Sequence, residues 1–417
     1  MTERPDSAAW LARFVGGRTP PTRETLRGWE RWRKSRNDFL PAPRMDATAW
    51  RLMSPRKRAL HDLHRAATHS NLPVLATPMA RKVATRLTTR LKTNWLKQKP
   101  TTRAGVMITG GGAQGKTETV CEIAATFQDE WERLGQLTAV AQPGTRDLIA
   151  PIAYVQTPVT AKPKSTCKAI LNFYGAPITS RMDLPDLVHQ VAASLRDHGT
   201  RVLVLDDITR LRMHRADDQD TLDLIRALMS MHVTLVLVGV DIPSSGLLRE
   251  GRFDRPRSQV SFASATSRGA FGLQATQTER RFDLVELDRF RYDTPDQIAA
   301  WVQHLSGVEE CLRLLRASTE MLTGGTMPEY LHRRTNGVVG LLERLIEDGC
   351  EEAMSSGSEC LTESLLEGID IILGNSFDQT SREAPKIPKH NPTSSRRTRN
   401  RNGSFDDKGP SSIDAGA

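Results

Sequence analysis

One short segment restricts the possible folds more than any other part of the sequence: MITGGGAQGKTETV, residues 107–120. From Gly110 it has a glycine, four further residues, then Gly115, Lys116 and Thr117, which is the pattern G-x-x-x-x-G-K-[ST] of a phosphate-binding loop. Glycines let successive backbone N–H groups converge on phosphate oxygens, and a helix after the loop points its positive dipole end at the same anion. The charge of Lys116 would meet the β- and γ-phosphates, and the hydroxyl of Thr117 would ligate Mg²⁺.

The segments on either side of the loop are those that a phosphate-binding loop requires. Residues 105–108, GVMI, predict a short buried strand. After the loop, apolar residues recur at helical spacing from Val120 to Leu134. A glycine-rich turn with a chance lysine is the alternative, but the strand–loop–helix setting favours the phosphate-binding loop.

A second segment supplies the acidic half of a nucleotide site. RVLVLDDI, at 201–208, places four apolar residues before Asp206 and Asp207, which predicts a buried strand that delivers Asp206 to its carboxyl end. Asp206 would hold Mg²⁺, and Asp207 would orient and activate the attacking water. Two caps on the next helix are the alternative, and the preceding phosphate loop favours the nucleotide site.

Strands alternating with helices predict an α/β fold. Further strands are predicted at 151–158, 232–243 and 280–290, of which 232–243 is expected to be buried, and a helix capped by Asp183 is predicted at 183–200. The alternation predicts a parallel, doubly wound sheet. No Asn-Lys-x-Asp run is present, which favours an adenine over a guanine nucleotide.

The net charge of +9 is distributed unevenly. Residues 1–104 hold 23 basic and 7 acidic residues, a net +16, and residues 375–417 hold 8 and 5, a net +3. Residues 105–374 therefore carry a net −10. A basic extension on an acidic core indicates a polyanion partner, most simply nucleic acid, with solubility as the alternative.

Four regions are expected along the chain. Basic, helix-forming segments come first, then the nucleotide-binding core, then apolar residues at helical spacing that predict a small lid, and finally a Ser/Pro/Arg-rich tail whose composition cannot bury a core. The predicted boundaries are 1–100 for the extension, 101–290 for the core, 291–374 for the helical lid and 375–417 for a disordered basic tail.

Two basic segments leave their role open. Residues 22–40 interleave Arg and Lys with Trp29, Trp32 and Phe39, which suits base stacking and phosphate contact as well as an amphipathic helix that packs its tryptophans. A loop at 209–220 carries Arg210, Arg212, His214 and Arg215, which would face DNA in a ring or be ordinary solvated charge.

Composition also indicates where the protein works. The five cysteines are scattered without a C-x-x-C pair, which is typical of reduced thiols in a cytosolic protein and predicts no zinc site. No run of about 18 apolar residues is present, and the N-terminus has no apolar signal region. We therefore expect a cytoplasmic protein without a membrane partner.

The order of segments resembles a known group. GGGAQGKTE, AYVQTP, KAILNFYGAP, HGTRVLVLDDI, LVLVGV, RRFDLVEL and RRTNGVVGLL are similar to the TniB-type transposition ATPases, AAA+ proteins related to IstB and MuB. The resemblance covers about residues 75–370 and leaves out the basic extension and the tail. It implies a P-loop AAA+ core with a helical lid, which binds ATP and Mg²⁺.

The resemblance assigns residues where the motif matches. Asp206 matches the magnesium aspartate, while Asp207 stands where the family usually has Glu, so the attacking water would be held differently and hydrolysis would be slower. Thr117 and Asp206 are the expected metal ligands. The nucleotide-binding residues are expected to be Gly110, Gly111, Gly112, Ala113, Gln114, Gly115, Lys116, Thr117 and Glu118.

Other AAA+ positions match less closely. The family expects an arginine finger before the fifth strand, reaching a neighbouring subunit's γ-phosphate, and Arg281, with Arg280 as the second choice, occupies that place. Asp241 is the nearest polar residue to the sensor 1 position, and Arg344 lies one turn beyond the sensor 2 position.

The family implies an ATPase that assembles as a ring or filament on double-stranded DNA, without sequence preference, and regulates a DDE-type transposase. Two alternatives fit the same core: a signalling or scaffold ATPase whose basic arm binds a protein or membrane surface, and a helicase-loader-like ATPase.

Overall fold

A computed structural model gives the fold of most of the chain. The residues it describes are 21–138, 149–158, 162–210, 219–243, 245, 251–254, 259–262 and 278–371.

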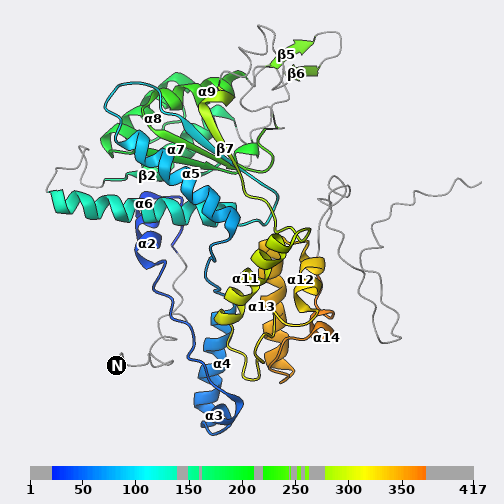
Figure 1. Cartoon of the computed structure of the whole chain (residues 1–417). Helices are drawn as coiled ribbons and strands as arrows, with labels where there is room; N and C mark the ends of the chain where they lie inside the picture. The colour runs from blue at the N-terminus through cyan, green and yellow to red at the C-terminus, as the bar shows by residue number, and fades with distance from the viewer. Residues whose placement is uncertain are drawn as a thin grey trace, which may run out of the picture.

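A five-stranded sheet lies at the centre of the upper part of the molecule, with the order β2-β3-β4-β1-β7 (Figure 1). All neighbouring strands in it are parallel. Parallel strands covered on both faces bury nearly every residue, and β1, β3 and β4 are buried along their whole length. The predicted parallel, doubly wound sheet is confirmed. Its strands are β1 (Gly105–Thr109), β2 (Ile152–Gln156), β3 (Val202–Asp206), β4 (Thr234–Gly239) and β7 (Phe282–Glu286).

Helices cover both faces of this sheet (Figure 1). On one face, Val83, Leu87 and Leu91 of α5 join the same apolar core as the strands. On the other face, α8 begins at the predicted cap, where the Asp183 carboxylate accepts a hydrogen bond from the Asp186 N–H at 2.9 Å. The covering helices are α5 (Pro78–Trp95) and α6 (Lys116–Thr138) on the first face, and α7 (Pro163–Tyr174), α8 (Leu184–Asp197) and α9 (Gln219–Ser230) on the second.

The predicted helical lid follows β7 and has its own apolar core. Trp301 is fully buried at its centre and donates a hydrogen bond from its indole N–H to the carbonyl of Pro328 at 2.9 Å. A capping box at Thr294 and Gln297 starts the first lid helix. The lid helices are α11 (Pro295–Cys311), α12 (Met327–Thr335), α13 (Val339–Ser355) and α14 (Glu363–Leu366).

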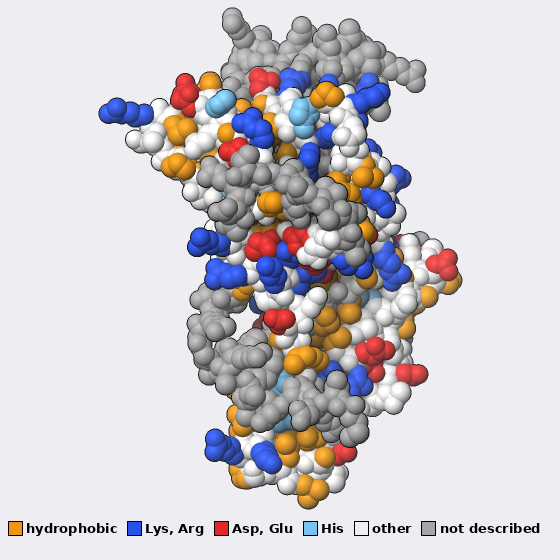
Figure 2. All heavy atoms as spheres, turned by 90° about the vertical axis from the view of Figure 1, so that its left-hand side faces the viewer, with side chains coloured by type: hydrophobic (Ala, Val, Ile, Leu, Met, Phe, Trp, Pro, Cys, Tyr) orange, Lys and Arg blue, Asp and Glu red, His pale blue; other side chains and the backbone are white. Residues whose placement is uncertain are grey.

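The N-terminal helix α2 (Leu26–Ser35) packs directly on α6 of the nucleotide core. Trp29 is 1% exposed, and its indole N–H donates to Gln128 Oε1 at 2.9 Å. Arg33 and Arg36 both pair with Asp129 of α6. Figure 2 shows acidic and basic side chains intermingled at this height of the molecule. Packing therefore accounts for the Trp29 ring, so of the two roles left open for this segment the amphipathic helix is the one observed.

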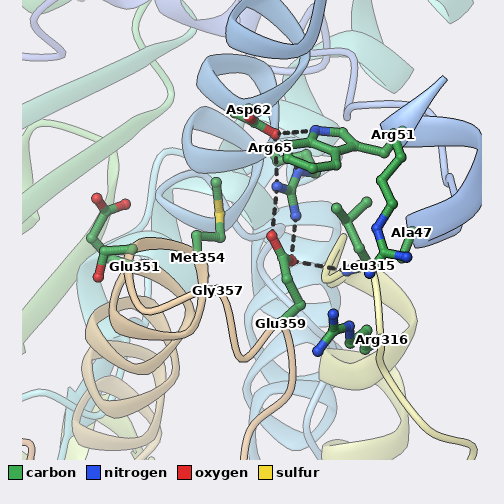
Figure 3. Close-up of a pocket in the computed structure, with 12 residues that line it drawn as sticks. Ala47, Arg51, Asp62, Arg65, Leu315, Arg316, Glu351, Met354, Gly357 and Glu359 are labelled. Atoms are coloured by element: carbon green, nitrogen blue, oxygen red, sulfur yellow. Dashed lines mark hydrogen bonds and ion pairs between the residues drawn. The ribbon is translucent and has the colours of Figure 1, made fainter. Parts of the chain in front are cut away.

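Helix α4 (Pro55–His69) packs instead on the lid. The buried guanidinium of Arg65 donates to both carboxylate oxygens of Glu359, at 2.7 and 3.0 Å, and also to Asp62 (Figure 3). This pair lines a pocket of about 420 Å³ between α4, the short helix α3 (Ala47–Arg51) and the lid. The residues that line the pocket are distant in sequence from the phosphate loop. The segment predicted as a separate extension thus contacts the core through α2 and α5 and the lid through α4, while the predicted domain boundaries stay a prediction.

Some predictions fall on residues that lie outside the described part. The tail at 375–417 and residues Arg212, His214 and Arg215 of the basic loop are among them, as is the side chain of Arg210. An antiparallel pair, β5 (Gly251–Asp254) with β6 (Gln259–Phe262), was not predicted from the sequence. Two short 3-10 turns complete the described elements, η1 (Ile208–Arg210) and η3 (Glu279–Arg281).

Candidate nucleotide-binding site

The phosphate loop leaves β1 at Thr109 and enters α6 at Lys116, as the motif predicts. The ammonium group of Lys116 donates hydrogen bonds to the carbonyls of Gly110, at 3.1 Å, and Gly111. Its side chain is buried, and this burial lowers its pKa, while the negative charges of Asp206 and Asp207 raise it. The lysine is therefore held over the loop and close to the paired aspartates.

The loop leaves open space on its concave side. A Cβ atom added at Gly112 or Gly115 would meet no atom within 4 Å. Gly115 has a φ of 74° and Ala113 a φ of 55°, both in the left-handed region that turns backbone N–H groups toward one point. The loop therefore has the shape of an anion cradle at the start of α6.

Thr117 and Asp206 meet at the carboxyl edge of the sheet. The threonine hydroxyl donates to Asp206 Oδ2 at 2.6 Å, although the residues lie 89 positions apart in the chain. Asp206 is the last residue of β3 and is only 3% exposed. The two residues expected to hold Mg²⁺ are thus brought together because β1 and β3, with β4 between them, run parallel and end at the same edge of the sheet.

Tyr154 is a contributor to the site that sequence reasoning missed. Its hydroxyl donates to Asp206 Oδ2 at 2.8 Å, and both burial and the Asp206 charge raise the pKa of Tyr154. The register that pairs Tyr154 with Val204 sets its position two residues before the end of β2. The segment AYVQTP is one of those that carry the family resemblance, but its sequence alone does not indicate a contact with Asp206.

Asp207 follows in a strained backbone conformation, with a φ of 52°. Its N–H donates to Asp206 Oδ1 at 2.8 Å, and its Oδ2 accepts a hydrogen bond from Gln156 Nε2 at 3.2 Å. Gln156 pairs with Asp206 across the β2–β3 ladder. This glutamine orients the carboxylate that is expected to act on water.

The N-terminal segment also reaches the start of α6. The guanidinium of Arg23 donates to both oxygens of Glu118, at 2.9 and 2.5 Å. It also lies 5.0 Å from the ring centroid of Trp32 and 5.8 Å from that of Tyr154. Glu118, expected among the nucleotide-binding residues, is thus engaged with the N-terminal segment in this structure.

The lid touches the loop directly. The N–H of Gly340, in the first turn of α13, donates to the carbonyl of Ala113 at 2.8 Å. A Cβ at Gly340 would lie 2.7 Å from that oxygen, so only glycine allows this approach. Movement of the lid would therefore be transmitted to the tip of the phosphate loop.

The remaining predicted residues, Arg281, Asp241 and Arg344, lie at three different places in the structure. Arg281 precedes β7, and the pairing of Phe282 with Gly105 places it at the amino edge of the sheet, opposite the phosphate loop. Asp241, with a φ of 46°, follows β4, which lies between β1 and β3, so it is at the same carboxyl edge of the sheet as the loop. The next residue, Ile242, donates its N–H to Thr109 Oγ1 at 3.1 Å. The side chain of Arg344 is 62% exposed and lies 3.8 Å from Asp348 within α13, so we assign it no role in the site.

The residues present fit a nucleotide with its metal ion. The loop offers open N–H groups and a lysine to phosphates, while Thr117 and Asp206 offer a hydroxyl and a carboxylate, the oxygen ligands that Mg²⁺ prefers. Within the described ranges, no group of three or more His, Cys, Asp or Glu side chains could hold a metal ion. A magnesium ion would therefore depend on these two residues, water and the phosphates themselves.

Comparison with protein families decides what kind of core this is. The model of the bacterial TniB protein matches residues 74–247, which run from just before α5 to beyond β4. This stretch is similar to the TniB family, and we call it the TniB segment. The TniB segment contains the phosphate loop, Tyr154, both aspartates and the strands β1 to β4. Together with β7 and the helical lid, which follow the segment, it forms the P-loop AAA+ fold. A search of curated proteins gave no match.

Solved structures give distant likenesses over part of the chain. Orc1 from Aeropyrum pernix in complex with DNA is 13% identical, with a TM-score of 0.48, over 72% of this chain and 67% of that one. Cdc6p from Pyrobaculum aerophilum is 15% identical, with a TM-score of 0.41, over 73% and 74%. AMPPCP-bound DnaA from Aquifex aeolicus is 14% identical, with a TM-score of 0.37, over 70% and 66%. We draw no function from these likenesses.

Proposed function

We propose that this protein is an ATPase that binds double-stranded DNA in an ATP-dependent manner and regulates a DDE-type transposase. The observation that carries the proposal is the meeting of Lys116, Thr117 and Asp206 at one edge of the sheet, with the Thr117 hydroxyl 2.6 Å from Asp206 Oδ2. Phosphoryl transfer depends on positioning and charge stabilisation, which are what these groups supply. Bound magnesium would neutralise charge that develops on the phosphates.

Each residue of the cluster has a distinct task in this proposal. Lys116 and the loop N–H groups bind the phosphates, Thr117 and Asp206 hold the metal, and Tyr154 fixes the Asp206 carboxylate. Asp207, oriented by Gln156, activates water. Because an aspartate is shorter than the glutamate usual at that position, we expect slow hydrolysis, which suits a switch more than a motor.

Arg281 would complete the site in a neighbouring copy. β1 rises about 13 Å over the four residue steps from Gly105 to Thr109, at roughly 3.3 Å per residue. Arg281 therefore lies at the amino edge of the sheet and the phosphate loop of the same chain at the carboxyl edge. In a ring or filament, the amino edge of one copy would meet the loop of the next. ATP would then stabilise the assembly, and hydrolysis would loosen it.

The DNA part of the proposal depends on the charge of the first 104 residues, a net +16. Part of that charge is neutralised inside the chain, since Arg33, Arg36 and Arg65 all pair with carboxylates. Other cations of this region remain exposed to a polyanion. The transposase partner comes from the family resemblance of the TniB segment.

The test is DNA binding with ATP, with ADP and in Lys116→Ala. Fluorescence anisotropy of a labelled random-sequence duplex would report affinity, with Lys164→Ala, an exposed lysine of α7 outside both the loop and the first 104 residues, as a control for the loss of one lysine charge. We expect tight binding only for wild type and Lys164→Ala with ATP. Equal binding by Lys116→Ala, or binding indifferent to both ATP and salt, would contradict the proposal.

A further inference from the structure

The stretch from residue 63 to residue 117 contains no aspartate or glutamate, although it contains ten lysines and arginines. About half of this stretch is helix α5 and the segment that links it to β1. Surface segments whose only task is solubility usually intersperse acidic residues among the basic ones. The lack of acidic residues here makes the position of the cations on the folded helix informative.

Helix α5 separates its side chains into two faces. Val83, Leu87 and Leu91 are at most 1% exposed and pack into the core under the sheet. The opposite face is exposed and carries only basic and small polar side chains. These exposed residues are Arg81, Lys82, Thr85, Arg86, Thr89, Lys92 and Thr93.

Ion pairs within the described part of the chain leave most cations of this face without a carboxylate partner. Arg90, at its margin, is bound to Asp283 of β7 at 2.7 and 2.5 Å. Among the described residues, however, no carboxylate forms an ion pair with Lys82, Arg86 or Lys92. This contrasts with α2, where Arg33 and Arg36 are taken up by acidic residues of α6. The charge on α5 is therefore available to an outside partner.

We propose that the exposed face of α5 is the surface on which the phosphate backbone of duplex DNA docks, a proposal that rests on the proposed function. Lys82 and Lys92 lie about 15 Å apart along the helix axis at roughly 1.5 Å per residue. Duplex DNA carries about one negative charge per 1.7 Å, so this length spans several phosphates. The hydroxyls of Thr85 and Thr93 already donate to the carbonyls of Arg81 and Arg90, at 2.9 and 3.1 Å, so the contacts to phosphate oxygens come mainly from the cations. Such contacts hold DNA without reading its sequence.

An anionic membrane surface fits the same face less well. Helices that lie in a membrane interface insert apolar side chains beneath the headgroups. The apolar residues of α5 are already buried in the protein core, and its outward face between Arg81 and Thr93 offers none. Charge without an inserting face favours a rigid, highly charged polymer over a lipid surface.

The experiment compares two double variants of the full chain. Lys82→Ala/Arg86→Ala removes two charges from α5, and Arg56→Ala/Lys57→Ala removes two exposed charges from α4 as the matched control. Affinity for a random-sequence duplex is measured with ATP from 50 to 200 mM NaCl. We expect the slope of log K against log salt to fall in magnitude by about 1.8 in the α5 variant, roughly 0.9 per phosphate contact, with a loss of about 10- to 100-fold in affinity near 100 mM salt. The control is expected to keep the wild-type slope.

The outcomes separate this proposal from the proposed function. If wild type binds DNA and the α5 variant keeps the wild-type slope, the surface assignment is overturned and the function stands. If wild type binds no DNA, both fail. Loss of binding to phosphatidylserine vesicles with unchanged DNA binding in the α5 variant also overturns the assignment. Should the double variant unfold, Lys82→Ala alone is expected to reduce the slope by about 0.9.

Discussion

The hydroxyl of Tyr154 donates a hydrogen bond to Asp206 Oδ2 at 2.8 Å, so a strand neighbour fixes the carboxylate that is expected to hold magnesium. The same tyrosine ring stacks against Trp29, with centroids 6.3 Å apart and an angle of 15° between the planes. Through these two contacts, the N-terminal helix α2 is joined to the metal end of the site.

Tyr154→Phe is expected to weaken the apparent affinity for Mg²⁺ about 10-fold, because groups that orient a metal ligand contribute effects of that size. Binding of ATP without metal should change little, since the phenyl ring still fills its place. Titration of Mg²⁺ into the protein with a fluorescent ATP analogue would measure both. Tyr174→Phe, which removes a hydroxyl bonded to Thr200 instead, is the matched control. Equal Mg²⁺ affinities in the two variants would show that Tyr154 does not position Asp206.

Trp29→Ala is expected to lower the free energy of unfolding by about 3–5 kcal/mol, because the fully buried indole leaves a cavity. The buried Gln128 would also lose its hydrogen-bond donor. Urea denaturation followed by circular dichroism gives the change. Trp29→Phe should cost much less, since it fills most of the volume. A loss below about 1 kcal/mol for the alanine variant would mean that α2 is not part of the folded core.

Stability is expected to fall as the pH is lowered from 6.5 toward 4. Burial lowers the pKa of His69, beside the charges of Arg65 and Arg313, and that of His304, each to about 4. A histidine whose pKa is lower in the folded than in the unfolded protein gives its full stability above the unfolded value of about 6.5 and loses it as protonation favours unfolding. The loss is roughly 3 kcal/mol for each at most.

Urea unfolding at pH 7.5 and pH 5 tests this dependence. His69→Gln keeps an acceptor for the N–H of Arg313, which donates to His69 Nε2 at 2.9 Å, but removes the titrating group. The difference between the two pH values should shrink in that variant. A difference of unchanged size would exclude His69 as a source of the acid sensitivity.

Arg281→Ala and Lys116→Ala should each lose ATP hydrolysis alone yet recover part of it when mixed. Arg281 lies at the edge of the sheet opposite the loop of its own chain, so it would act on the loop of a neighbouring copy. Mixed assemblies contain some interfaces in which one copy has an intact loop and the other has an intact Arg281. A coupled phosphate-release assay would detect the recovery, with Arg280→Ala as the neighbouring control. No recovery at any ratio would contradict a finger that acts between copies.

The central sheet was predictable because β1 to β4 are short, largely apolar runs, and the phosphate loop has an invariable spacing. The positions of Thr117 and Asp206 followed from the rule that parallel strands present ligands at their carboxyl ends. Tyr154 was not predictable, because its side chain reaches Asp206 only through the β2–β3 register. The burial of Trp29 was not predictable either, since its partners on α6 lie about 99 positions away in the chain and the local sequence fits two roles equally.

The most direct test of the nucleotide site is calorimetric titration of Mg·ATP into wild-type protein and Lys116→Ala, with Lys97→Ala as the control for removal of a lysine. Saturable binding at one site per chain in wild type and Lys97→Ala, weakened at least about 10-fold in Lys116→Ala, is the predicted result, since a charge-assisted contact to phosphate contributes about 1.5–3 kcal/mol. Equal affinity in all three proteins, or no heat of binding in any, would contradict the assignment of the loop that Lys116 closes.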